Sequence, residues 1–155
     1  MTVDLGMKKA SGVSLREITA DTVRAICNLK VSKEQEQFVA SNSVSIAQAY
    51  FSDEAWFRAI YANDKPVGFV MLYDDPKNGT YFLWRLMIDA GYQGRGYGRH
   101  ALELLVDYVK TRPNAKELRT SHAKGDGNPG GFYKKVGFEY TGEKEDNELV
   151  MRLEL

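Results

Sequence analysis

Four closely spaced glycines lie directly after an apolar run and directly before a helical pattern. Residues 91–98 read Gly-Tyr-Gln-Gly-Arg-Gly-Tyr-Gly. Because glycine permits positive φ and close backbone approach, such a loop exposes its backbone N–H groups. The N-terminus of the following helix adds about half a positive charge. These features together predict an anion site suited to a phosphate group.

Two common phosphate-binding patterns do not match this loop. A P-loop requires Lys followed by Ser or Thr after its last glycine, and no such pair follows Gly98. A dinucleotide fingerprint has the spacing G-x-G-x-x-G after the first strand of its unit. Here the spacing is G-x-G-x-G and the loop follows the fourth predicted strand. The glycines alone are equally consistent with a simple turn.

The form that does match is Gln-x-x-Gly-x-Gly at residues 93–98. It resembles the pyrophosphate loop of the GNAT superfamily of acetyl-CoA-dependent N-acetyltransferases. A second segment, residues 128–138, reads Asn-Pro-Gly-Gly-Phe-Tyr-Lys-Lys-Val-Gly-Phe and is similar to a later motif of the same family. The distance between the two segments leaves room for a helix, a strand and a helix. The resemblance covers residues 13–155.

Hydrophobic periodicity predicts one α/β domain over residues 13–155, with the element order β-α-α-β-β-β-α-β-α-β-β. The resemblance implies a GNAT fold, with a mixed, mostly antiparallel sheet of about seven strands and about four helices. We expect strands and helices at the following ranges: strands 13–18, 56–62, 66–74, 80–89, 117–122, 138–143 and 149–155, and helices 19–30, 43–50, 97–112 and 132–136. Residues 1–12 show no periodicity and are expected to be a loose leader.

The resemblance implies a set of residues that contact acetyl-CoA. The backbones of Leu86, Met87 and Ile88 would hydrogen-bond the pantetheine arm where neighbouring strands splay apart. The pyrophosphate would be held by the backbone N–H groups of Gln93, Gly94, Arg95, Gly96, Tyr97 and Gly98. Tyr133 would lie near the thioester sulfur as the general acid for the departing thiolate. Its reference pKa of ~10, above the ~8.5 of a thiol, leaves it protonated and available as a donor at neutral pH.

Two positions depart from the family pattern. Many members carry Asn a helical turn or two before the tyrosine, whereas here Asp126 lies seven residues before Tyr133 and Asn128 lies five before it. Asn128 is the candidate for this cofactor contact, on a loop that its Gly-Asn-Pro-Gly context indicates to be rearranged. In polyamine-acetylating relatives an acidic residue often lies where Trp84 stands here, and tryptophan cannot accept a proton.

A proton acceptor is nevertheless required, because an alkylamine with a pKa near ~10.4 is almost wholly ammonium at pH 7. The candidates are Glu34, Glu36, Asp89 and His122. His122 has the best-matched reference pKa and is the candidate catalytic base. Glu34 and Glu36 are better suited to binding a cationic substrate.

The finer resemblance is to bacterial spermine/spermidine acetyltransferases, through residues 84–89, 92–94 and 138–143. It implies direct transfer of an acetyl group from acetyl-CoA to a primary amine, with a polyamine as first choice. Asp53 and Glu54 would then join the two early glutamates in a negative channel. The alternatives are another amine (an amino acid, an antibiotic, a protein N-terminus or lysine) or a non-catalytic acyl-CoA-binding sensor.

The composition of the chain argues against several other classes of protein. The chain has 155 residues, with 21 basic and 21 acidic side chains, so its formal charge of zero argues against a binder of bulk nucleic acid. No apolar run approaches the ~20 residues of a membrane span, and no signal peptide is evident, so a cytoplasmic location is expected. One cysteine, Cys27, and two histidines predict neither an internal disulfide nor a metal site. A homodimer is left open.

Overall fold

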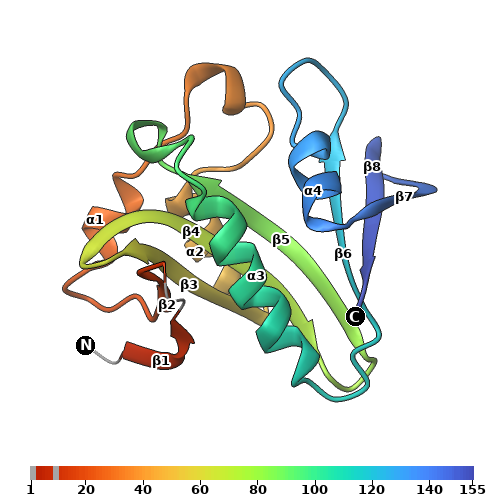
Figure 1. Cartoon of the computed structure of the whole chain (residues 1–155), viewed down its shortest axis with the longest axis horizontal. Coiled ribbons are helices and arrows are strands. Elements are labelled where there is room, and N and C mark those ends of the chain that lie inside the picture. The colour runs from red at the N-terminus through yellow and green to blue at the C-terminus, as the bar shows by residue number, and fades with distance from the viewer. Residues whose placement is uncertain (1–2, 9–10) are drawn as a thin grey trace.

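The computed structural model describes residues 3–8 and 11–155. Its eight strands form one sheet in the order β1-β2-β3-β4-β5-β6-β8-β7, in which only β5 and β6 are parallel neighbours (Figure 1). The strands are β1 (Val3–Lys8), β2 (Val13–Arg16), β3 (Ala55–Ala62), β4 (Lys65–Asp75), β5 (Thr80–Ile88), β6 (Glu117–Ala123), β7 (Glu139–Glu145) and β8 (Glu148–Glu154). The helices are α1 (Val23–Cys27), α2 (Asn42–Ala49), α3 (Tyr97–Lys110) and α4 (Gly130–Val136), with 3-10 turns η1 (Lys33–Gln35) and η2 (Ala90–Tyr92).

The predicted mixed α/β fold is confirmed, and each of the seven expected strands corresponds to one of β2 to β8. The prediction of a leader without regular structure over residues 1–12 is wrong for Val3–Lys8, which form β1 and pair with β2. Backbone pairing at a sheet edge needs no apolar alternation, so periodicity could not reveal this strand. Residues 1–2 and 9–10 of the expected leader lie outside the described residues.

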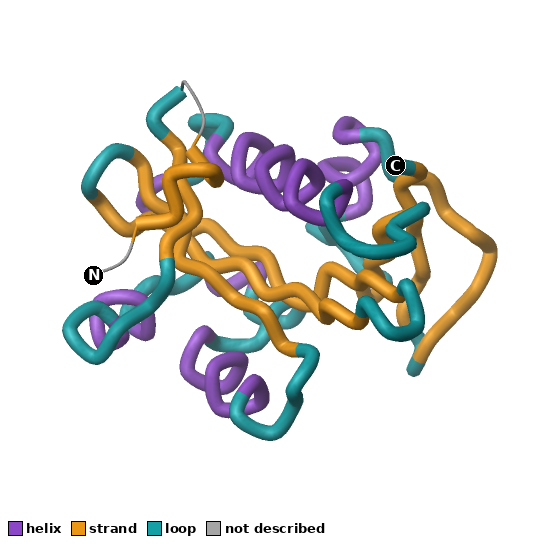
Figure 2. The backbone as a smooth tube through the Cα atoms, turned by 90° about the horizontal axis from the view of Figure 1, so that it is seen from below, coloured by secondary structure: helices purple, strands orange, loops and turns teal. Residues whose placement is uncertain are grey.

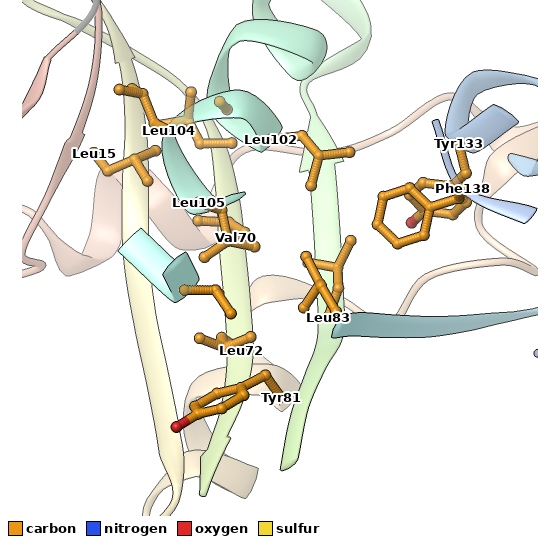
Figure 3. Packing of buried hydrophobic residues seen from close by; sticks show 14 of the residues in the cluster. Leu15, Val70, Leu72, Tyr81, Leu83, Leu102, Leu104, Leu105, Tyr133 and Phe138 are labelled. Atoms are coloured by element: carbon orange, nitrogen blue, oxygen red, sulfur yellow. The ribbon is translucent and has the colours of Figure 1, made fainter. Parts of the chain in front are cut away.

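Helices cover both faces of the sheet, which gives three layers (Figure 2). On one face, α3 buries the apolar stripe that includes Leu102 and Leu105 against Leu15 and Val70 (Figure 3). On the other face, α1 contributes Ile26 to a second cluster of buried side chains on β3, β4 and β5. The sheet is therefore held rigidly between two apolar layers, which suits it to position a site.

Strands β5 and β6 pair only at their beginnings. Phe82 is opposite Arg119, and Leu83 is opposite Thr120. After these two pairs β5 continues to Ile88 without pairing to β6, and Figure 1 shows the two strands separating toward their C-terminal ends. The predicted splay between neighbouring strands is therefore present, and it leaves one edge of β5 without a strand partner.

A β-bulge lies at the point where the two strands begin to separate. Met71 pairs with Arg85 and Leu72 pairs with Leu83, so Trp84 is an extra residue on β5. A bulge bends its strand and increases the local twist. The bulge therefore turns the end of β5 away from β6.

Candidate functional site

A cleft of about 930 Å³ occupies the opening between β5 and β6. Its walls come from segments that are far apart in the sequence: residues 31–40, the end of β5, the loop and helix start at 92–99, the end of β6, residues 127–133 and the β7–β8 hairpin. All but one of the residues predicted to bind the cofactor line this cleft, and the exception is Arg95. Its exposed guanidinium lies over the ring of Tyr92 instead.

The glycine-rich loop has the backbone that an anion site requires. Gly94 and Gly96 have φ of +78° and +83°, a region that other residues rarely adopt. Gly96 precedes α3, whose N-terminus has no side-chain cap, and the first N–H to bond back along the helix is that of His100. The N–H groups of the first turn therefore have no helical acceptor and are available to an anion.

Two side chains hold this loop in place. The Gln93 amide donates hydrogen bonds to the Ile88 carbonyl (2.9 Å) and to Oε1 of Gln35 (2.7 Å). Asp89 accepts from the backbone N–H of Lys30 (2.8 Å) and from that of Gly91 (3.0 Å). Both Asp89 oxygens are thus engaged in backbone contacts, and this carboxylate does not line the cleft.

The free edge of β5 presents alternate peptide groups to the cleft. The N–H of Asp89 donates to β4, and the Met87 carbonyl lies against Gly68 of β4. Since peptide groups alternate along a strand, those of Leu86 and Ile88 face the opening. Leu86 therefore offers its backbone N–H and carbonyl to the pantetheine arm. Ile88 offers its N–H, since its carbonyl accepts from Gln93, while the backbone of Met87 is directed to β4.

Tyr133 lies on α4 at the cleft wall and is 7% exposed. Figure 3 shows it beside Phe138. Its hydroxyl is hydrogen-bonded to Thr120, which in turn donates to the Leu83 carbonyl (3.1 Å) where β5 and β6 separate. Burial, with a smaller contribution from the negative charge of Glu148, raises the pKa of Tyr133 to about 12 against the opposing Thr120 hydrogen bond. The phenol therefore stays protonated at neutral pH.

His122 also lines the cleft, but its side chain is almost fully buried. Nδ1 lies 2.8 Å from the Ala123 carbonyl, and Nε2 lies 2.9 Å from the Tyr140 hydroxyl. A carbonyl can only accept, so Nδ1 carries the proton and Nε2 accepts from Tyr140. Both nitrogens of this candidate base are thus already engaged by groups of the protein.

Asn128 lines the cleft, and its amide is used by its own loop. Nδ2 donates to the Gly125 carbonyl (2.8 Å), and Oδ1 accepts from the Gly130 N–H (2.9 Å) at the start of α4. The predicted contact between the Asn128 amide and the cofactor would require one of these two hydrogen bonds to break.

The expected negative channel is formed differently from the prediction. Of its four carboxylates, only Glu36 lines the cleft, whereas Glu34, Asp53 and Glu54 do not. Glu34 lies exposed on η1, and Asp53 and Glu54 follow α2 in the chain, whereas the cleft segment at 31–40 precedes it. Of the four predicted carboxylates, Glu36 is therefore the one placed at the cleft.

Three acidic residues of the β7–β8 hairpin line the cleft instead, namely Glu145, Asp146 and Glu148. Glu148 Oε1 accepts a hydrogen bond from the Ser121 hydroxyl at 2.7 Å. The sequence predicts only a connection between two strands here, and the insertion of β8 between β6 and β7 brings that connection to the end of β6. Sequence order could not reveal this contact.

Arg85 is a second cleft residue that sequence reasoning missed. Its guanidinium donates to the Trp84 carbonyl (3.1 Å) and to Oε1 of Gln48 (3.0 Å), while its buried Nε has no partner among the described residues. Burial lowers the pKa of Arg85, and the charge of Glu148 partly offsets that effect. The cleft lining thus combines two arginines, Arg85 and Arg99, with a larger number of carboxylates.

Within residues 3–8 and 11–155, no three His, Cys, Asp or Glu side chains gather closely enough to hold a metal ion. None of the helices in this part of the chain is both long and apolar enough to cross a membrane.

Comparison with known proteins agrees with this geometry. Residues 23–138 match the model of the "Acetyltransferase (GNAT) family". The chain is 31% identical over 150 residues to "Spermine/spermidine N(1)-acetyltransferase" of Bacillus subtilis (strain 168), covering 92% of this chain and 99% of that protein. It is 32% identical over 104 residues to "Peptidyl-lysine N-acetyltransferase YjaB" of Escherichia coli (strain K12), covering 67% of this chain and 63% of that protein. The fold is similar to that of PaiA N-acetyltransferase from Thermoplasma acidophilum in complex with coenzyme A, with a TM-score of 0.70, 15% identity, and coverage of 92% and 99% of the two chains.

Proposed function

The chain belongs to the GNAT acetyltransferase family, and on this premise we propose that it transfers an acetyl group from acetyl-CoA directly to a primary amine. The observation that carries the proposal is the opening between β5 and β6, which leads to the uncapped N-terminus of α3. An unpaired strand edge suits the amide groups of a pantetheine arm, and an uncapped helix start suits a pyrophosphate.

Acetyl-CoA would be held mostly by backbone groups. The backbone groups of Leu86 and the N–H of Ile88 pair with the pantetheine arm in the manner of an added strand. The N–H groups of residues 93–98 bind the pyrophosphate. A Cβ built at Gly94 would meet nothing within 4 Å, so there is open space beside the loop for a phosphate to approach.

Tyr133 is the proposed donor to the CoA sulfur. A pKa of about 12 lies above the ~8.5 of a thiol by roughly 3.5 units, so complete proton transfer costs about 5 kcal/mol. A hydrogen bond that strengthens as negative charge develops on the sulfur carries no such cost. The phenol therefore stabilises the leaving thiolate, which takes its final proton as the product leaves.

A polyamine such as spermine or spermidine is the proposed acceptor. Support comes from the Bacillus subtilis relative, whose name states that acceptor, and from the charges of the cleft. Glu36, Glu145, Asp146 and Glu148 outnumber the lining arginines, Arg85 and Arg99. Such an excess attracts a substrate with several ammonium groups.

Steady-state kinetics with spermine, spermidine and a monoamine tests this acceptor. We expect kcat/KM to favour the polyamines, and we expect the preference to shrink at ~0.5 M salt because screening shortens the Debye length to roughly half its length at physiological salt. A preference for an uncharged or anionic acceptor would exclude the polyamine. A protein that binds acetyl-CoA but releases no CoA thiol with any amine would instead be the acyl-CoA-binding sensor.

One observation favours a second acceptor class. The half-buried Arg85 lines the cleft, and its positive charge can attract a carbonyl oxygen or a carboxylate. An amino acid or a peptide carries such a group next to its amine, and the Escherichia coli relative is named for a peptidyl-lysine acceptor. Arg85→Ala would raise the KM of such a substrate and would not raise the KM of a polyamine.

A cytoplasmic location, a homodimer and a single domain over 13–155 stay predictions.

A further inference from the structure

The two faces of β6 carry different chemistry into the cleft. Buried side chains alternate along this strand, and Thr120 and His122 lie on the buried face. That face is directed to α4, because Thr120 is hydrogen-bonded to Tyr133 and a Cβ built at Gly130 would lie 3.0 Å from Nε2 of His122. Since side chains alternate along a strand, Ser121 is directed to the opposite face.

Glu148 lies on that opposite face. It begins β8, where it is paired with Ala123 at the end of β6, and its carboxylate accepts the Ser121 hydroxyl at 2.7 Å. Its charge acts on both Tyr133 and Arg85, so it lies within electrostatic reach of the proposed sulfur donor and of the end of β5. The cleft therefore has a protonated phenol on one side of the sheet and a carboxylate on the other.

We propose that Glu148, oriented by Ser121, receives the ammonium group of the acceptor and accepts a proton from its nitrogen. This role rests on the proposed function and supplies the carboxylate that Trp84 cannot provide. Glu148 is half-buried and lines the cleft, and its second oxygen accepts no hydrogen bond from the described residues. It thus differs from Asp89 and His122, whose polar atoms are already engaged.

The proton balance of the step is as follows. The ammonium loses one proton to Glu148, an N–H bond breaking as an O–H bond forms, and the neutral nitrogen attacks the thioester carbonyl carbon. The C–S bond breaks, and the thiolate accepts the hydrogen bond of Tyr133. The nitrogen then loses its second N–H proton, and the thiolate takes up one proton to become CoA thiol. The products are the amide, CoA thiol and one net proton, which Glu148 releases to water.

The pH dependence of Glu148→Gln tests this role. Glutamine keeps the shape and can accept the Ser121 hydrogen bond, but it carries no charge and accepts no proton. We expect kcat/KM to fall by about 10²-fold at pH 7, with the loss shrinking as pH approaches the amine pKa of ~10.4, where the substrate is already neutral. The dissociation constant of acetyl-CoA should stay unchanged.

Two further variants keep the test interpretable if Glu148→Gln is poorly folded. Ser121→Ala keeps the Glu148 carboxylate but removes the hydrogen bond that orients it. We therefore expect a smaller loss of kcat/KM at pH 7, which should also shrink as the pH rises. If Glu148 had only a structural role, its variant would lose activity by the same factor at every pH. Glu139→Gln on the same hairpin lies outside the cleft lining, and its kinetics should equal those of the wild type.

The outcomes separate this inference from the proposed function. A wild-type protein that acetylates no amine overturns the function. An active wild type whose Glu148→Gln variant keeps the same kcat/KM at pH 7 overturns the role of Glu148 alone. A larger, pH-rescued loss in His122→Asn than in Glu148→Gln also overturns it and assigns proton transfer to His122.

Discussion

The hydroxyl of Tyr140 lies 2.9 Å from Nε2 of His122, and the two rings meet edge to face at 5.7 Å. This contact fixes the imidazole through the only nitrogen that could otherwise face a substrate. It joins β7 to the end of β6, although the two strands are not neighbours in the sheet.

The first prediction concerns this pair. Tyr140→Phe keeps the ring and removes the hydrogen bond to a buried acceptor, so we expect a loss of about 1 to 2 kcal/mol in the free energy of unfolding. Urea denaturation measures it. Because Glu148 is the proposed proton acceptor, activity per folded molecule should change less than threefold. A loss of activity near 10²-fold would show that the His122–Tyr140 pair moves the proton.

The second prediction concerns the glycine-rich loop. Gly96→Asp introduces an anion among the N–H groups that would hold the pyrophosphate, so the dissociation constant of acetyl-CoA should rise at least tenfold. Gly142→Asp is the matched control, because Gly142 has nearly the same φ, +87°, on β7 away from the cleft. Both variants should lose similar stability, about 1 to 2 kcal/mol. If calorimetric titration finds that the two variants bind acetyl-CoA with equal affinity, the loop is not part of the cofactor site.

The third prediction concerns the sulfur donor. Tyr133→Phe deletes one hydroxyl in a packed environment, so kcat should fall by about 10²-fold while acetyl-CoA still binds. Thr120→Val would remove the partner of the Tyr133 hydroxyl while keeping the side-chain volume at position 120, and we expect a smaller loss of kcat. Wild-type kcat in Tyr133→Phe, under conditions where chemistry limits the rate, would contradict the role.

The fourth prediction concerns stability at high pH. The pKa of Tyr133 is raised from 10.0 to about 12 by burial, so the folded state retains a proton that the unfolded state loses. The corresponding stability is fully present below pH 10 and is lost as pH rises toward 12, by up to about 3 kcal/mol. Unfolding free energies between pH 9 and 11 should therefore decline less steeply in Tyr133→Phe than in the wild type. If the free energy of unfolding declined equally steeply with pH in both proteins, Tyr133 would not be the cause of the decline.

The sequence predicted those parts of the site that are local in the chain. The loop at 93–98, the end of β5 and the α4 tyrosine each carry a contiguous motif whose chemistry follows from residue type and spacing. Glu148 has no such motif, since it reaches the cleft only because β8 lies between β6 and β7. The Asn128 amide could not be foreseen either, because the turn of its own loop engages both of its polar atoms.

The most direct test of the account follows the acetyl group itself. The wild-type protein would be incubated with acetyl-CoA labelled in its acetyl carbons and with spermidine, and both products would be quantified by mass spectrometry and a thiol assay. The account predicts labelled N-acetylated amine and free CoA thiol in equal amounts, with both reduced in Tyr133→Phe. CoA thiol without acetylated amine, or no product with spermidine or any other amine of the panel, would contradict it.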